Sequence, residues 1–140
     1  MQLNHTGTLE ERSNTILIVD DDYLMLRLGR EVLGLYGYDV ITAISEEEAL
    51  QIHASSEKRI ALVILDHKLK GEKRGLEIAK LLRSRDPAIK TIVASDSSHQ
   101  NETPDQLVSE VDVYLTKPYA MHTLANEVQR LLPRGVEGIG

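Results

Sequence analysis

Short apolar runs alternate along the chain with segments in which apolar residues recur every three or four positions. The apolar runs are rich in β-branched residues and bounded by turn-forming residues, which is typical of buried strands. They predict five strands, at residues 15–20, 38–42, 60–66, 90–95 and 112–116. Strands that alternate with helical segments predict an α/β fold: a doubly wound, five-stranded parallel sheet with helices on both faces.

The helical segments lie between these strands. The first is marked by apolar residues at spacings of four and three, namely Leu24, Leu28, Val32 and Leu35. A second helix opens at Ser45, which stands three residues before Glu48 as in a capping box. Three more helices are expected at residues 75–85, at residues 101–110, and from Met121 until Pro133 stops the last one.

Length and composition fit one domain. A chain of 140 residues can bury one core, and we expect a flexible lead-in at residues 1–14, the domain at 15–132 and a tail at 133–140. No apolar run reaches the length of a membrane span and the N-terminal residues lack a secretory signal, so a cytoplasmic protein is expected. With a net charge of -6, the basic footprint of a nucleic-acid-binding protein is missing, and we expect no direct contact with DNA.

Three carboxylates follow the first apolar run directly, because the stretch from Ile16 reads ILIVDDD. Right-handed crossovers place the carboxyl ends of parallel strands along one edge of the sheet, where ligands bind. The residues delivered to that edge are Asp20, Asp21, Asp66, Ser95 and Lys117. Carboxylates this close repel one another and need a cation, and oxygen ligands without His or Cys suit Mg²⁺. A carboxylate beside that ion can attack phosphorus and form an aspartyl phosphate.

In this order, these residues resemble the receiver domains of two-component response regulators. The resemblance rests on the acidic pair after the first strand, VILD ending the third, VAS ending the fourth and LTKP after the fifth. It spans residues 15–132 and implies a flavodoxin-like strand order 2-1-3-4-5. It also implies a signalling domain rather than an enzyme, one that catalyses only its own phosphorylation and dephosphorylation.

The resemblance assigns the acceptor and the metal ligands. Asp66 would take a phosphoryl group from a phosphohistidine on a histidine kinase or a histidine phosphotransferase. Asp20 and Asp21, together with Asp66 and the backbone carbonyl of Lys68, would hold Mg²⁺. The loop after the acceptor, HKLKGEKRG, places Gly75 one position later than usual, similar to receivers of hybrid histidine kinases. Within that loop we expect the side chain of His67 to be solvated.

The resemblance also implies a switch. Lys117, joined to Pro118 by a cis peptide bond, would contact the phosphoryl group, while Ser95 would swing in to bind it and Tyr114 would turn inward. Asp96 stands after Ser95 where a small residue is usual, which bears on the rate of phosphorylation. The surface that responds would comprise the fourth helix, fifth strand and fifth helix, and its partner is a downstream protein or a second copy in a homodimer.

Two alternatives remain open at this point. Asp20 and Asp22 fit the D-x-D spacing of haloacid-dehalogenase-type phosphohydrolases, with Asp20 as nucleophile and Asp22 as general acid. However, Asp22 opens a helix, where an aspartate commonly serves as N-cap. The second alternative is a degenerate receiver that acts as a constitutive interaction module. A flavodoxin is disfavoured, because three carboxylates would repel the phosphate of a flavin.

Overall fold

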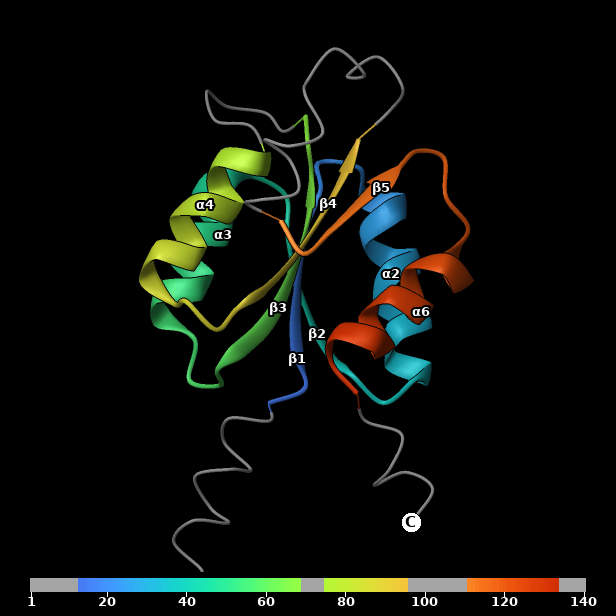
Figure 1. The fold of residues 1–140 in the computed structure, drawn as a ribbon, viewed down its shortest axis with the longest axis horizontal. Helices are drawn as coiled ribbons and strands as arrows, with labels where there is room; N and C mark the ends of the chain where they lie inside the picture. The colour runs from blue at the N-terminus through green and yellow to red at the C-terminus, as the bar shows by residue number, and fades with distance from the viewer. Residues whose placement is uncertain (1–12, 69–74, 96–110, 134–140) are drawn as a thin grey trace, which may run out of the picture.

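The computed structural model describes residues 13–68, 75–95 and 111–133, which form a parallel sheet flanked by helices (Figure 1). The sheet has five strands in the order β2-β1-β3-β4-β5, and each neighbouring pair is parallel. Their bounds are β1 Thr15–Val19, β2 Asp39–Ala43, β3 Ile60–Asp66, β4 Lys90–Ser95 and β5 Val113–Thr116. The predicted fold class and strand order are confirmed, with strand ends that differ by at most one residue.

Helices cover both faces of this sheet, as predicted (Figure 1). On one face lie α2 (Tyr23–Leu35) and α6 (Met121–Leu131), and on the other α3 (Glu46–Ser55) and α4 (Gly75–Arg85). The helix expected at residues 101–110 lies outside the described residues. Within the described part of the chain, no helix is long and apolar enough to cross a membrane.

The alternation of side chains along each strand builds two separate cores. In β1, Ile16 and Ile18 face the cluster that contains Leu124 and Val128 of α6. Leu17 and Val19 face the opposite cluster, formed with α3 and α4. Strands that are buried on both faces appear in the sequence as continuous apolar runs, which is why the predicted strand boundaries agree closely with the structure.

The helix predicted from Leu24, Leu28, Val32 and Leu35 is present as α2, but of these four residues only Val32 packs against the core. Leu24, Leu28 and Leu35 are exposed by 63%, 40% and 87%, whereas Leu26 and Leu33 are buried. Gly29 belongs to the buried face, where a Cβ atom would come within 2.8 Å of Ile18 Cδ1. The helix therefore packs onto the sheet through a stripe that contains a glycine, and the sequence pattern did not reveal that stripe.

Two helix starts were predicted correctly. Asp22 is the N-cap of α2, and its side-chain oxygen accepts a hydrogen bond from Leu24 N at 3.0 Å. Ser45 caps α3 in the same way, since its hydroxyl accepts from Glu48 N at 3.1 Å. These bonds satisfy amides that lack partners inside the helices.

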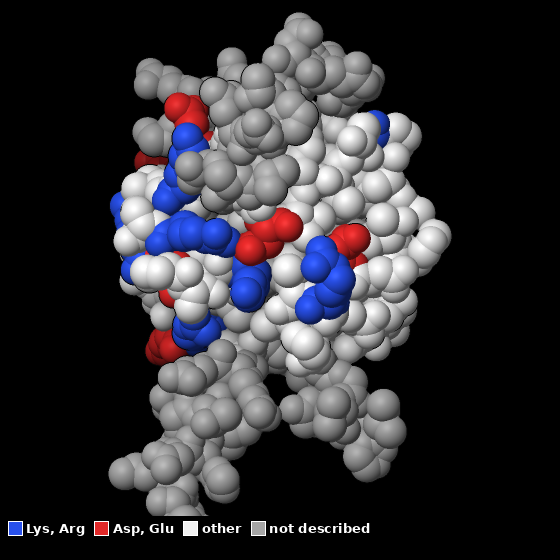
Figure 2. Space-filling view, viewed as in Figure 1, with Lys and Arg blue, Asp and Glu red and all other residues white. Residues whose placement is uncertain are grey.

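The charged side chains are mixed rather than segregated on the face drawn in Figure 2. Lys and Arg side chains there lie beside Asp and Glu side chains, most of them over the half of the molecule that contains α3 and α4. Among the described residues on this face, the basic groups form no continuous positive surface of the kind that holds a nucleic acid backbone.

Candidate phosphoryl-acceptor site

The acidic residues after β1 are fixed by main-chain hydrogen bonds. Asp20 N donates to Ala43 O of β2 at 3.0 Å, which continues the β1–β2 ladder by one residue. The Asp20 carboxylate accepts from Asp22 N at 3.0 Å and is only 4% exposed as a residue. Asp20 therefore points into the protein at the carboxyl edge of the sheet, while Asp21 beside it is half-buried.

The sheet brings Asp66 to the same place from β3. One oxygen each from Asp20, Asp21 and Asp66 lies within 4.8 Å of the others. Lys117 Nζ lies 3.1 Å from Asp66 Oδ2 and 3.8 Å from Asp20 Oδ2. One ammonium thus faces three carboxylates, which leaves an excess of negative charge.

This donor set fits a hard divalent cation. All three side chains offer oxygen atoms, and Mg²⁺ prefers oxygen ligands, few of them from protein carboxylates. The unbalanced charge gives the site a physical reason to bind a cation. The fourth ligand expected, the carbonyl of Lys68, stays a prediction; the amide of the same residue lies 3.4 Å from Asp66 Oδ1.

The electrostatics of the site are most visible at Asp20. Burial is the main cause that raises the pKa of its carboxyl from 3.8 to about 6, and the charges of Asp66 and Asp21 act in the same direction. The hydrogen bond from Asp22 N and the ammonium of Lys117 oppose this rise without cancelling it. The ionised form of Asp20 is therefore costly in the metal-free protein.

The other side of the site is formed by the ends of β4 and β5. Ser95 is buried, and its carbonyl accepts a hydrogen bond from Lys117 N at 2.6 Å. The expected cis peptide bond between Lys117 and Pro118 is present. The structure thus brings together Asp20, Asp21, Asp66, Ser95 and Lys117, as predicted from the strand ends, whereas Asp96 lies outside the described residues.

His67 is buried, so the expectation of a solvated side chain is wrong. The main chain explains the difference, because His67 N donates to Ala94 O at 2.7 Å and keeps the residue in the sheet after β3 ends. Gly75 N in turn donates to His67 O at 2.9 Å. A Cβ atom on Gly75 would lie 2.3 Å from Asp66 O, so only glycine allows α4 to start this close to the acceptor strand.

Tyr119 is a site neighbour that the sequence analysis missed. Burial, together with the charges of Asp20 and Asp66, raises the pKa of its hydroxyl well above the ordinary range. The hydroxyl lies 3.8 Å from Met25 Sδ of α2, so the aromatic ring links the segment after Lys117 to that helix. Its place directly after Lys117 and Pro118 was the available signal.

Tyr114 lies in β5, at the sheet edge opposite β2. Its side chain is half-buried and packs against the cluster formed with α3 and α4. The hydroxyl is buried and has no hydrogen-bond partner within the described part of the chain. In this position Tyr114 is an aromatic side chain packed against the core.

A partly exposed group of polar contacts connects the start of β5 to β4 and α4. Asp112 accepts from Thr91 N of β4 at 2.8 Å and forms an ion pair with Arg83 of α4. Arg83 also donates to Ile89 O at 3.1 Å. The strands that deliver Ser95 and Lys117 are thereby tied to the helix that follows the acceptor loop.

Fold and site together define an α/β domain with three clustered carboxylates, whose oxygen atoms fit a divalent cation, and a lysine at the carboxyl edge of its sheet. The chain belongs to the family described as response regulator receiver domain, whose model matches residues 16–129. Receiver domains of response regulators are signalling domains that take phosphoryl groups from histidine kinases.

Individual relatives agree with this assignment. The chain is 31% identical over 129 residues to transcriptional regulatory protein PrrA of Mycobacterium tuberculosis, covering 92% of this chain and 53% of the relative. It is 33% identical over 119 residues to the alkaline phosphatase synthesis transcriptional regulatory protein PhoP of Bacillus subtilis, covering 85% and 48%. The chain thus spans about half the length of these relatives.

A solved structure of a response regulator has the same fold. The response regulator protein TrrA from Thermotoga maritima, solved in complex with Mg²⁺ and beryllofluoride, superimposes with a TM-score of 0.73 and 32% identity. The match covers 85% of this chain and 99% of that one.

Proposed function

We propose that Asp66 is the phosphoryl acceptor of this receiver domain. The observation that carries the proposal is the position of Lys117 Nζ, 3.1 Å from Asp66 Oδ2, at the strand edge where Asp20 and Asp21 add their carboxylates. Asp20 is the less accessible nucleophile, because its side chain is 6% exposed against 12% for Asp66. The main-chain amide that it accepts is also closer, at 3.0 Å against 3.4 Å.

The transfer is a substitution at phosphorus. A carboxylate oxygen of Asp66 forms the new P–O bond, while the P–N bond to the imidazole of a phosphohistidine donor breaks and the imidazole leaves. Lys117 offers its ammonium to the phosphoryl oxygens on the side of Asp66 Oδ2. Asp20, Asp21, Asp66 and the carbonyl of Lys68 would hold Mg²⁺, which when bound offsets the charge of the carboxylates and of the phosphoryl oxygens.

The donor in this proposal is a histidine kinase or a histidine phosphotransferase, and the output is a change of surface. A phosphoryl group adds roughly -1.5 to -2 charges and three acceptor oxygens, which favour inward movement of the Ser95 hydroxyl. The hydroxyl of Tyr114, buried without a partner among the described residues, makes a second position of this side chain inexpensive. The surface around β5 and α6 then meets a downstream protein or a second copy of the domain.

The experiment is phosphorylation by acetyl phosphate with Mg²⁺, followed by intact mass. The wild-type domain should gain one phosphoryl group, and Asp66→Asn should gain none. Asp22→Asn is the matched control, because asparagine caps a helix as well as aspartate does. If Asp66→Asn still gains a phosphoryl group while Asp20→Asn gains none, the D-x-D phosphohydrolase interpretation, in which Asp20 is the nucleophile, replaces this one.

A further inference from the structure

The outward side of α2 is apolar, although no described element covers it. The helix packs on β1, β2 and α6, and its buried side is formed by Leu26, Gly29 and Leu33. Among the described residues, six large apolar side chains are exposed, and five of these belong to α2 or to its C-cap. Because single exposed apolar residues are usually scattered, this concentration on one helix marks an interaction surface.

Four residues form the side of α2 that points away from the sheet. They are Leu24, Leu28, Glu31 and Leu35, and we call them the outward seam. Their spacings are four, three and four, so at about 100° for each residue they lie within about 60° of one another around the helix axis. This is the spacing of the contact seam in a two-helix coiled coil. A helix is therefore the element that fits the outward seam.

The order of residues along the outward seam fits a second copy of the same helix. Leu24 and Leu35 lie equally far from the middle of the seam, and so do Leu28 and Glu31. An antiparallel copy would therefore place its own Leu35 against Leu24, and the methylene groups of its Glu31 against Leu28. A two-fold axis repeats both contacts, as in an isologous interface.

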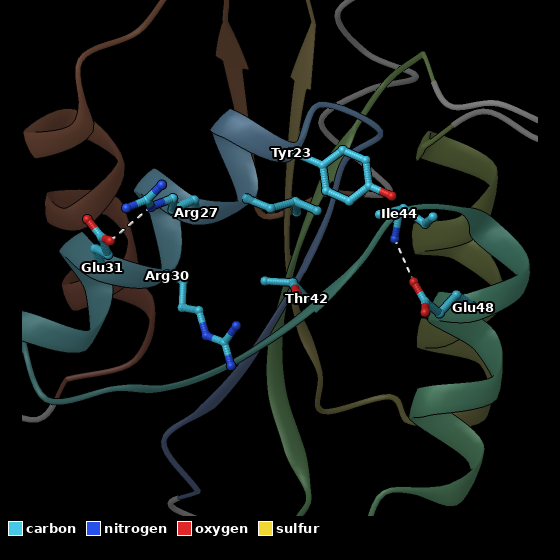
Figure 3. A pocket seen from close by; sticks show the side chains of 8 residues that line it. Tyr23, Arg27, Arg30, Glu31, Thr42, Ile44 and Glu48 are labelled. Atoms are coloured by element: carbon cyan, nitrogen blue, oxygen red, sulfur yellow. Dashed lines mark hydrogen bonds and ion pairs between the residues drawn. The ribbon is translucent and has the colours of Figure 1, made fainter.

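The charges of the seam agree with the same arrangement. Arg27 Nε lies 3.3 Å from Glu31 Oε2, and the two side chains are 77% and 61% exposed. Figure 3 shows this pair on α2, where both residues also line a pocket beside β2. In the antiparallel arrangement, the Glu31 carboxylate of one copy comes beside Arg27 of the other. A parallel arrangement would instead place the two Glu31 carboxylates together, and like charges repel.

We propose that two copies of this domain associate through the outward seam of α2, antiparallel to one another about a two-fold axis. The seam contains no residue of the acceptor site and none of β5 or α6, so this association does not depend on the proposed function of Asp66. A single helix from each copy buries less area than a standard interface does. The dissociation constant should therefore be on the order of 100 μM.

The test is sedimentation equilibrium of the unphosphorylated full chain. Between about 10 μM and about 1 mM, the weight-average mass should rise from that of a monomer toward that of a dimer. Leu28→Gln should weaken association about tenfold or more, because the two-fold axis counts the change twice. Ile44→Gln is the matched control, since Ile44 is 39% exposed against 40% for Leu28 and lies outside the seam. In the ¹⁵N-labelled domain, amides of α2 should shift with concentration while those around Asp66 stay unchanged.

Exchange of charge identifies the occupant as a second copy. Arg27→Glu makes the pair entirely acidic and Glu31→Arg makes it entirely basic, so each variant alone should associate more weakly than the wild type. An equimolar mixture of the two should associate more strongly than either, because both contacts across the two-fold axis are then of opposite charge. The proposal is overturned if the wild type stays monomeric at about 1 mM. It is also overturned if Ile44→Gln weakens association as much as Leu28→Gln, if the mixture behaves as its components do, or if the responding amides lie in β5 and α6.

Discussion

Removing the charge of Asp20 should stabilise the metal-free domain. The change Asp20→Asn keeps the side-chain volume and an oxygen that can accept the Asp22 amide, which bonds Asp20 at 3.0 Å. It removes a carboxylate whose pKa is raised from 3.8 to about 6, mainly by burial. At about 1.4 kcal/mol for each pKa unit, the ionised carboxylate costs the folded state about 3 kcal/mol at neutral pH. For a domain of this size that corresponds to a rise in Tm of roughly 10 °C.

The pH dependence follows from the sign of the shift. The folded state holds the Asp20 proton more tightly than the unfolded chain does, because the folded pKa of about 6 exceeds the ordinary value of 3.8. The contribution of this group to the stability of the wild type is therefore present in full below about pH 4 and is lost as the pH rises through about 6. Asp20→Asn should lack this loss, so the two proteins should diverge between these pH values and differ by a constant amount above them.

The assay is urea unfolding followed by circular dichroism in the presence of EDTA, at a series of pH values. Glu57→Gln is the control, since it neutralises an exposed carboxylate that forms no ion pair within the described part of the chain. Added Mg²⁺ should stabilise the wild type and have little effect on Asp20→Asn, because the ion offsets the same repulsion. If Asp20→Asn is no more stable than the wild type at neutral pH, or the difference is the same at pH 4, the buried charge is not the source of the cost.

Two further changes test the framework around the acceptor. Gly75→Ala should lower the free energy of unfolding in urea by about 2 kcal/mol, since the new Cβ atom would lie 2.3 Å from Asp66 O. Gly34→Ala is the control: no atom lies within 4 Å of the Cβ position, so the change should be neutral or stabilising by up to about 1 kcal/mol. Lys117→Gln should raise the pKa of Asp20 further, because the ammonium 3.8 Å away favours the ionised carboxylate. An NMR titration of the Asp20 carboxyl measures this pKa, and an unchanged value would contradict the ion pair.

The sequence predicted the sheet well because its strands are buried on both faces. Ile16 to Val19 read as one apolar run, since alternate residues enter different cores but all are apolar. The topology rule then placed Asp20, Asp66 and Lys117 at one edge without any knowledge of side-chain contacts. That rule depends on chain connectivity, so its placement of the site stays correct even where a predicted strand end differs by one residue from the structure.

The spacing of apolar residues did not identify which face of α2 is buried. Two stripes of α2 have helical spacing, one through Leu24 and Leu28 and one through Leu26, Gly29 and Leu33. The buried stripe looks less apolar because it contains a glycine, and that glycine is present because the helix packs so closely against Ile18. Periodicity counts apolar residues and does not measure the approach of a helix to a sheet, so it predicted the helix correctly without identifying the residues that pack on the sheet.

The acceptor site is held rigid by the sheet rather than by its loops. Asp20, His67 and Lys117 each donate a main-chain hydrogen bond to the neighbouring strand, at 3.0, 2.7 and 2.6 Å, one residue beyond the end of their own strand. These bonds extend the hydrogen-bond ladders of the sheet to the site itself, so the main chain that carries the carboxylates cannot move apart without breaking the sheet edge. The repulsion is therefore built into the fold, and a divalent cation or a protonated Asp20 relieves it where movement of the backbone does not. Lys117 also connects Asp66 to Ser95, because its ammonium pairs with Asp66 and its main-chain amide donates to the carbonyl of Ser95. A charge added at Asp66 would therefore act on Ser95 through Lys117.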